Sequence, residues 1–592
     1  MSAISEPIAP SHEREIRADV SKEVPWELVT AFSRIVRESG TEGEWKAARY
    51  IYDKLKSWGA NVTMLEPELL ISLPRGAKLE VIAPQGLGAV RAKTPAFSLS
   101  TGGNAVEGAV VYVPSVKVEK IDDMFSARGP AGPVDLAGQI VISEGLSMPM
   151  RVREYEKRGA RAQIYVNPGT AIHEGICTSI WGTPTLANKD FKPATPIVCV
   201  NAPDGARLIE ACRKAELRVR IETRLDEGWV RCPLNTVWIE GYEEPEKFLL
   251  VHGHLDSWHE GIGDNATGDA ALLELARVFT RNRGKLRRSL RVCWWPGHSH
   301  GRYAGSTWFA DEFAMELRRN CIAQLNIDSP GCRDATEYME DVMWMQEADG
   351  FCKDVIRSVT GKDSRGKRPL RAGDYSFNQI GLTGFFMLLS NIPPAVRKQK
   401  GYNYIVGGCG GNIAWHTEAD LLDVADPEVL YTDINTYVTA ICRVLNADFY
   451  PFEHSKAAQE ILNHLRGYQE KCAGHFDFGP ALQAASELEA ALRCFENNIK
   501  NVKDPNERRE INRCLIELAR ILVPINYSRG ERYDHDPAIS LPPLPRLEKA
   551  GELAALAGDP SGYRFLQTEL RRERNKIVDA LDSARNLVQR FA

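Results

Sequence analysis

Half of the histidines in this chain lie in or beside four short polar segments, and this grouping predicts a metal site. The segments are residues 252–256 with Asp264, 294–306, 326–328 and 415–417, and the histidines are His252, His254, His259, His298, His300 and His416. Imidazole nitrogens combined with aspartate oxygens form a borderline ligand set that suits Zn, Mn, Fe or Co. Metal-dependent chemistry is therefore the first hypothesis.

Two of the candidate residues directly follow one predicted strand. The apolar run 248–251 predicts a buried strand that continues to His254 and Asp256. Because alternate residues of a strand point to the same side, His254 can bind a metal ion while Asp256 orients its ring. Asp264 follows in the glycine-containing loop 261–268, where its carboxylate can bridge two cations.

The other candidates come from later segments. Asp328 ends the predicted strand 322–327, and His416 lies in a glycine-rich loop. His252 and His259 are expected to pack beside the site rather than bind. In open α/β sheets, ligands bind at the carboxyl ends of the strands, so the candidates are expected to meet at one sheet edge.

The alternation of strands and helices predicts an α/β fold with a mixed sheet. Three regions are expected: a catalytic α/β domain (1–95 and 216–450), an inserted β-rich domain (96–215) and a C-terminal helical domain (451–592). With 592 residues, the chain is long enough for several domains. The helical domain is expected because strand signals almost vanish beyond Pro451 and long helix-periodic segments follow.

Composition excludes several classes of protein. A net charge of -5 gives no general basic surface for nucleic acid. No apolar run is long enough to span a membrane, and the N-terminus has no secretory signal pattern. The 13 cysteines are scattered and include no CxxC pair, which indicates reduced thiols and a cytoplasmic protein.

Taken together, these segments resemble the co-catalytic zinc aminopeptidase and glutamate carboxypeptidase family, in the branch that includes the transferrin receptor. The residues that carry the resemblance are Gly253-His254-Leu255-Asp256-Ser257-Trp258, Gly263-Asp264-Asn265-Ala266-Thr267-Gly268, Gly305-Ser306-Thr307, Asn326-Ile327-Asp328 and Trp415-His416-Thr417. The resemblance implies that residues 96–215 are a protease-associated domain and that the helical domain forms a homodimer.

The resemblance also implies a ligand set. His254, Asp264 and Asp328 would hold one metal ion, Asp264 and His416 would hold a second, and Asp256 would orient His254. The ions would be divalent transition metals, with zinc as the first candidate and iron or manganese as the others.

The chain departs from the family at one place. Where the family has two consecutive glutamates, a general base and a metal ligand, this chain has His298-Ser299-His300. Alignment from the preceding strand places His298 at the base, whereas alignment back from Gly305 places His300 at the ligand. We expect His300 to replace the missing ligand and His298 to accept the proton.

The expected function is metal-dependent hydrolysis of an amide or related C–N bond in a small molecule or short peptide. Two alternatives stay open: an iron- or manganese-dependent enzyme that is not a peptidase, and an inactive binding or scaffold protein.

Overall fold

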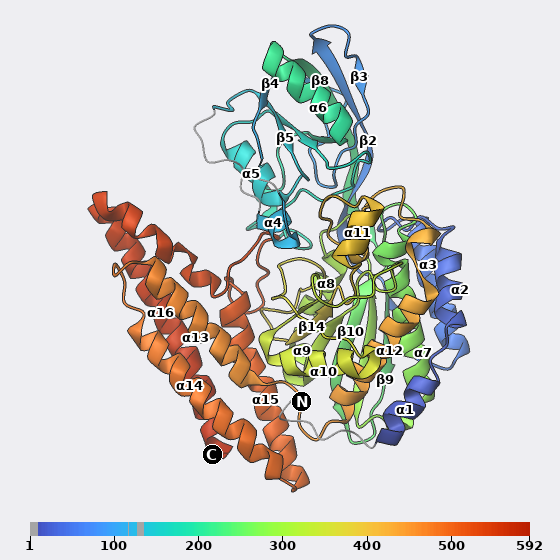
Figure 1. Cartoon of the computed structure of the whole chain (residues 1–592), viewed down its shortest axis with the longest axis vertical. Coiled ribbons are helices and arrows are strands. Elements are labelled where there is room, and N and C mark those ends of the chain that lie inside the picture. Colours follow the sequence, from blue (N-terminus) through green and yellow to red (C-terminus); the bar gives the residue numbers. More distant parts are fainter. Residues whose placement is uncertain (1–9, 116–117, 127–134, 592) are drawn as a thin grey trace.

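Two mixed sheets of seven strands organise the chain in the computed structural model, which describes residues 10–115, 118–126 and 135–591 (Figure 1). The first sheet has the order β1-β9-β11-β10-β12-β14-β13. Its strands are β1 (Asn61–Leu65), β9 (Leu234–Ile239), β10 (Glu244–His254), β11 (Arg288–Trp295), β12 (Cys321–Asn326), β13 (Met343–Trp344) and β14 (Gly384–Met387). The predicted α/β fold is confirmed.

The centre of this sheet is parallel and fully covered. Strands β11, β10, β12 and β14 pair in parallel, whereas the pairs at the two edges are antiparallel. On β10, Leu249 and Val251 belong to one apolar cluster and Phe248 and Leu250 to another, as the alternation of side chains in a strand requires. Burial on both faces explains why these strands are continuous apolar runs.

Helices cover both faces of the first sheet. One face carries α2 (Glu23–Phe32), α3 (Glu42–Ser57), α7 (Thr267–Arg281) and α12 (Pro427–Asn446), and the other carries α8 (Ala304–Glu312) and α9 (Ala314–Asn320). The remaining helices of this part are α1 (Pro10–Ala18), α10 (Asp349–Thr360) and α11 (Pro394–Lys400). This packing fixes the carboxyl ends of β10, β11 and β12 at one edge, where polar loops follow.

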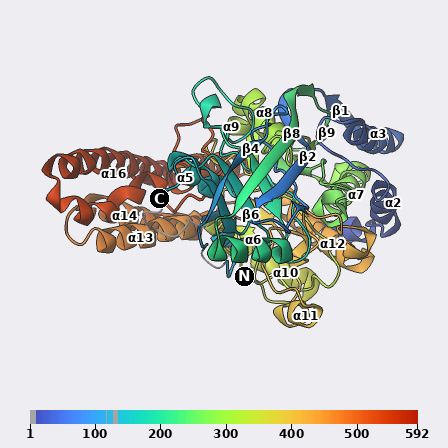
Figure 2. The ribbon, with the colours of Figure 1, turned by 90° about the horizontal axis from the view of Figure 1, so that it is seen from above.

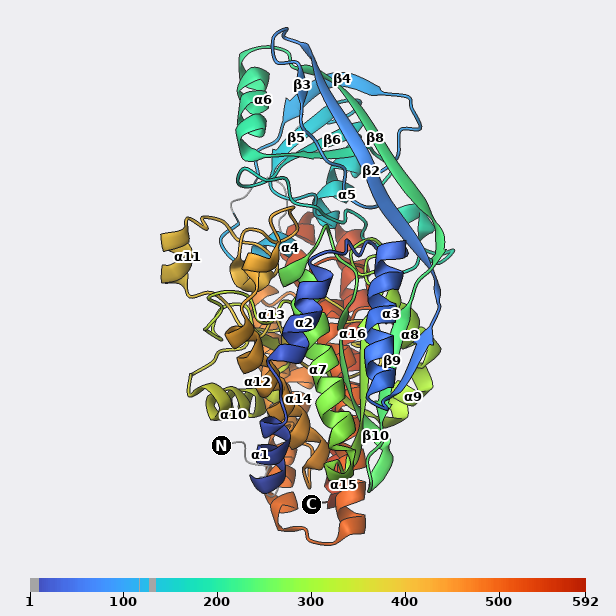
Figure 3. The same ribbon diagram turned by 90° about the vertical axis from the view of Figure 1, so that its right-hand side faces the viewer.

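The second sheet lies beyond that edge (Figures 1 and 3). Its order is β3-β2-β8-β4-β5-β6-β7, with β2 (Glu68–Ala83), β3 (Ala89–Val90), β4 (Val106–Tyr112), β5 (Ile140–Glu144), β6 (Ala162–Val166), β7 (Ile197–Val200) and β8 (Arg218–Arg231). Helices α4 (Ile121–Ser126), α5 (Pro149–Lys157) and α6 (Ala202–Lys214) accompany it. The long antiparallel pair β2–β8 draws on residues outside 96–215 and connects the two sheets. The identity of the second sheet and its helices as a protease-associated domain remains a prediction.

Four long helices form an arm beside the first sheet (Figures 1 and 2). They are α13 (His454–Lys471), α14 (Gly479–Asn498), α15 (Pro505–Tyr527) and α16 (Pro560–Val588). Asp504 and Asp559 cap the N-termini of α15 and α16 with their side chains, and each helix then starts with proline, which suits a first turn. None of the helices in the described part of the chain is long and apolar enough to cross a membrane. A homodimer through this arm remains a prediction.

Candidate metal centre

The carboxylate of Asp264 lies between two imidazoles. Its Oδ1 is 3.0 Å from Nε2 of His254, and its Oδ2 is 3.0 Å from Nε2 of His416. The loop that carries Asp264 is fixed by Asp420, whose carboxylate accepts hydrogen bonds from the backbone N–H groups of Gly263 and Asp264. Asp264 therefore lies where its carboxylate could bridge two cations, and its role as a metal ligand stays a prediction.

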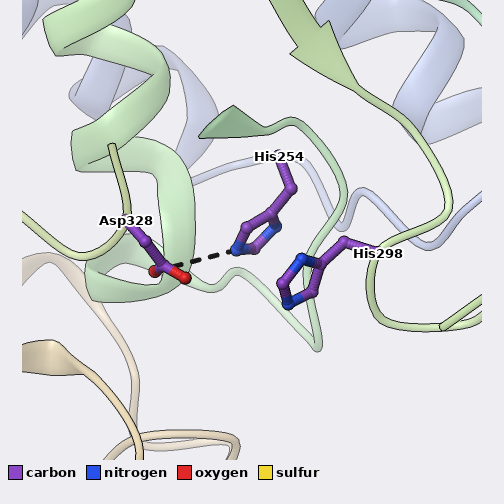
Figure 4. Close-up of side chains that lie close together, drawn as sticks. All are labelled: His254, His298 and Asp328. Atoms are coloured by element: carbon purple, nitrogen blue, oxygen red, sulfur yellow. Dashed lines mark ion pairs between the residues drawn. The ribbon is translucent and has the colours of Figure 1, made fainter. Parts of the chain in front are cut away.

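His254, at the end of β10, faces two carboxylates. Besides Asp264, Oδ1 of Asp328 lies 3.9 Å from its Nε2 (Figure 4). Burial opposes charging of the imidazole, but the hydrogen bonds and charges of Asp264 and Asp328 outweigh burial and raise the pKa of His254 well above its ordinary value. A metal ion would compete with this proton for the same nitrogen.

The donor atoms of this pair test whether a metal ion fits. Nε2 of His254 and Oδ1 of Asp264 are buried and lie 3.0 Å apart, and within the described residues neither atom has another partner of good hydrogen-bond geometry. A buried pair of this kind needs a shared proton or a cation between its two atoms. The residues present therefore fit a divalent ion.

His416 is held by a loop that belongs to the second sheet's part of the chain. Its Nδ1 lies 3.0 Å from the backbone oxygen of Glu174, to which it can donate a hydrogen bond. The backbone carbonyl of His416 in turn accepts a hydrogen bond from the N–H of Glu174. This contact leaves Nε2 free to face Asp264. His173 also holds the segment that carries His416, because its Nδ1 lies 2.7 Å from the carbonyl oxygen of Trp415.

His298 lies in a cluster of three side chains that could hold a metal ion. Among the described residues, its ligand atom and those of His254 and Asp328 lie within 4.8 Å of one another (Figure 4). Its Nδ1 is 2.9 Å from Asp374, whose carboxylate also accepts from Ser306 Oγ at 2.7 Å. Asp374 therefore orients the ring so that Nε2 is the free nitrogen.

His300 is not in this cluster of three among the described residues, and its role as the replacement ligand stays a prediction. Its ring packs against Trp258, with 4.1 Å between ring centroids, and its Nδ1 lies 3.0 Å from Ser39 Oγ. Trp258 also contacts His416, at 6.0 Å between centroids. The glycines at 297 and 301 let the turn fold tightly, so that the two histidines of the turn end in different surroundings.

Asp256 also differs from its predicted role. The atom that holds Nδ1 of His254 is the backbone oxygen of Asp256, at 2.9 Å, whereas the nearest carboxylate oxygen is 4.0 Å away. The carboxylate instead accepts hydrogen bonds from the backbone N–H groups of His298 and Ser299 and from Ser39 Oγ. Asp256 thus orients His254 through its backbone and fixes the His298 turn through its side chain.

The two histidines expected to pack beside the site do so. Nε2 of His252 lies 3.0 Å from Gln324, and burial lowers its pKa to about 4, which keeps it neutral. Nε2 of His259 lies 3.1 Å from the carboxylate of Glu174.

A pocket opens over the cluster between the two sheets. Asp264, His298, Asp328 and His416 form its polar side, and His173 and Glu174 reach it from the second sheet's part of the chain. Sequence reasoning missed Asp374, Asp420 and Glu174. Each is far in sequence from the residue that it holds, and none lies in a histidine-rich segment, so no local pattern could identify it.

Residues 236–438 match peptidase family M28. The mouse protein Aminopeptidase NAALADL1 is 23% identical over 410 residues, which cover 62% of this chain and 54% of that protein. The chicken Transferrin receptor protein 1 is 34% identical over 96 residues, covering 16% of this chain and 12% of that protein. This chain therefore spans about half the length of the mouse relative.

Among solved structures, an aminopeptidase from Aneurinibacillus sp. strain AM-1 superposes with a TM-score of 0.53 and 19% identity, covering 74% of this chain and 96% of the other. At that identity the likeness shows the fold alone. Together with the match of residues 236–438 to the model of peptidase family M28, it confirms the predicted resemblance.

Proposed function

We propose that this protein is a metal-dependent hydrolase of an amide or peptide bond in a small molecule or short peptide. The observation that carries the proposal is the buried carboxylate of Asp264 between His254 and His416, at the floor of a pocket. The names of the relatives, which include aminopeptidases and glutamate carboxypeptidases, support hydrolysis of peptide bonds as the reaction class.

The two metal positions differ in their ligands. His254, Asp264 and Asp328 would hold one divalent ion, and three protein ligands are usual for catalytic zinc. Asp264 and His416 would hold a second ion, and we do not assign His300 to it because its ring packs against Trp258. When bound, zinc would polarise the substrate carbonyl and acidify a water molecule. Iron or manganese would suit the same donors.

His298 is our candidate for the proton acceptor. Its ring is stacked on that of His254, with 3.8 Å between centroids and 16° between planes. A metal ion bonds an imidazole in the plane of the ring at about 2.0–2.1 Å, so two parallel rings at this spacing cannot both point their lone pairs at one ion. His298 therefore suits proton transfer better than ligation beside His254.

Asp374 completes this arrangement. A carboxylate that accepts from Nδ1–H of a histidine fixes its tautomer and stabilises the imidazolium that forms on protonation. Asp374 is 1% exposed and hydrogen-bonded to both His298 and Ser306, so the pair is rigid. His298 and Asp374 together can take over the proton transfer that a glutamate performs in the family.

Purified protein loaded with zinc tests the proposal on a panel of dipeptides and N-acyl amino acids, with release of amine as the readout. We expect hydrolysis of at least one compound, loss of activity with a chelator, and recovery when zinc is returned. His254→Ala should be inactive, and His12→Ala, at an exposed position far from the pocket, should behave as wild type. A zinc-loaded protein that hydrolyses nothing on the panel would favour the alternative of an inactive binding protein.

A further inference from the structure

Arg302 is a buried cation without a counterion. Its side chain lines the same pocket as the metal cluster, and the residue is 5% exposed. Within the part of the chain that the structure describes, its Nε and Nη2 have no hydrogen-bond partner and it forms no ion pair. Burial of an unpaired guanidinium is costly, so an anion is expected to bind it.

Aromatic stacking, rather than a salt bridge, holds Arg302 in place. Its guanidinium lies over the ring of Tyr303 at 5.2 Å, and Tyr303 packs against Trp181 in a tilted arrangement, with 4.1 Å between centroids and 37° between planes. The backbone is anchored as well, because the carbonyl of Arg302 accepts from Gly182 N–H at 2.7 Å. The donors of Arg302 are thus fixed in position before any ligand arrives.

A second arginine, Arg371, lies near Arg302, and the carboxylate of Asp536 stabilises its charge. Arg371 lies on Trp181, with 3.5 Å between its guanidinium carbon and the ring centroid. Its N–H groups donate to the backbone oxygens of Tyr375 and Asp536, which are neutral acceptors. Of the two buried guanidinium groups, Arg302 is therefore the one that lines the pocket.

Much of the remaining pocket wall is apolar, although Ser147, Asn167, His173 and Glu174 also line it. Its apolar side chains include Met124, Leu146, Met148, Leu370, Met387 and Leu388. A ligand that fits this pocket therefore has an anionic group for Arg302 and an apolar group for this wall. The amide to be cleaved would lie over His298 and Asp264.

We propose that Arg302 binds a carboxylate of the substrate, so that the substrates are amides with a free carboxylate near the cleaved bond and an apolar neighbouring group. This inference rests on the proposed function. A guanidinium can donate two parallel hydrogen bonds to a carboxylate, which adds geometric selectivity to the charge interaction. The carboxylate is either the chain terminus or an acidic side chain, and experiment can separate the two.

Binding is measured first, without any turnover. Zinc-loaded protein is titrated with 4-methylpentanoate and with 4-methylpentan-1-ol, which has the same apolar chain and no charge. We expect the acid to bind wild type tightly and Arg302→Gln on the order of 10²-fold more weakly, because one partner of a buried charge pair is lost. The alcohol should bind both proteins equally weakly. Arg319→Gln, at an exposed arginine outside the pocket, is the matched control.

The stability of the variants separates ligand binding from a structural role. Because Arg302 has no counterion, Arg302→Gln should keep or raise the melting temperature, whereas removal of a structural arginine would lower it. Arg302→Lys keeps the charge but not the fork of donors, and it should restore only part of the affinity. It also serves as the test variant if Arg302→Gln does not fold.

The source of the carboxylate is decided by kcat/KM for leucyl-leucine, leucyl-leucinamide and leucyl-glutamate amide. A fall for leucyl-leucine in Arg302→Gln would show that Arg302 binds the terminal carboxylate, and a fall for leucyl-glutamate amide would show that it binds an acidic side chain. The value for the neutral leucyl-leucinamide should not change. Equal binding of acid to wild type and Arg302→Gln, or no preference for acid over alcohol in wild type, would overturn the inference. Preferential binding of the acid without hydrolysis of any peptide would instead overturn the proposed function and leave the inference standing.

Discussion

The two sides of Asp264 are built in different ways. On one side, His254 and Asp328 come from the ends of the neighbouring parallel strands β10 and β12, whose register is fixed by the core of the first sheet. On the other side, His416 lies in a loop that is held by the backbone of Glu174 and by His173. The first side is therefore part of the rigid sheet edge, whereas the second depends on contact between two parts of the molecule.

The largest expected effect comes from removing the residue that the two sides share. Asp264→Asn should lose both metal ions and all turnover, because the neutral amide cannot bridge two cations. His254→Ala should also lose the first ion, but His416→Ala should keep close to one ion per chain. Elemental analysis of purified protein measures this, with Asp363→Asn, an exposed aspartate, as control. Equal metal loss in the His254 and His416 variants would remove the distinction between the two sides.

The next effect concerns the two histidines of the turn. His298→Ala should keep its metal and lose turnover on the order of 10²–10⁴-fold, the usual contribution of a positioned acid–base group. His300→Ala should retain both metal and most of its turnover, because its ring packs behind Trp258. Metal content and kcat, measured on the same preparations, separate the roles. Loss of metal in His300→Ala but not in His298→Ala would show that His300 is a metal ligand.

A smaller effect should appear only on the His416 side. Lys93 forms ion pairs with Glu174 at 2.8 Å and with Glu418 at 2.6 Å, and these residues flank the contact that positions His416. Lys93→Met should weaken the second ion by about tenfold, as is usual when a residue that supports a ligand is removed, and leave the first ion unchanged. Zinc titration against a competing chelator resolves the two affinities.

Lys78→Met is the control for that experiment, because Lys78 also pairs with a glutamate but on an exposed part of the second sheet. If Lys93→Met alters both affinities, the two sides of Asp264 are not independent.

The smallest effect on the site is expected from a change in the helical arm. Burial raises the pKa of Glu496 to about 7, and its carboxylate accepts from the backbone and the hydroxyl of Ser455. Because this folded-state pKa lies above the unfolded value of about 4.3, its stabilising contribution is complete below pH 4 and is lost as pH rises through 7.

Glu496→Gln should therefore raise stability at pH 8 by on the order of 2 kcal/mol and have little effect near pH 5. Thermal unfolding at the two pH values measures it, and metal content should not change at either. The same gain at both pH values would show that ionisation of Glu496 is not the cause.

The sequence was informative where candidate site residues directly follow a predicted strand. The apolar runs identified β10, β11 and β12, and the polar residues that follow them gave His254, Asp264 and Asp328. The long helices of the arm were also predicted, because their apolar spacing repeats over many turns. Such signals are local, so they can be read without coordinates.

What the sequence could not resolve depends on contacts across long separations. His298 and His300 differ by two positions and have the same side chain, so only the fold of the turn, fixed by Asp256 and Ser39, decides which one reaches the metal cluster. The roles of Asp374 and Glu174 arise from contacts with His298 and His416. The unpaired state of Arg302 is likewise a property of its surroundings.

Anomalous diffraction from crystals grown with zinc tests the central claim most directly. The account predicts a strong zinc peak about 2.0–2.2 Å from His254 Nε2 and from carboxylate oxygens of Asp264 and Asp328. It also predicts a weaker second peak between Asp264 and His416, and His298 Nε2 near the first ion without bonding to it. No peak at His254, or a peak bonded to His300, would contradict the account.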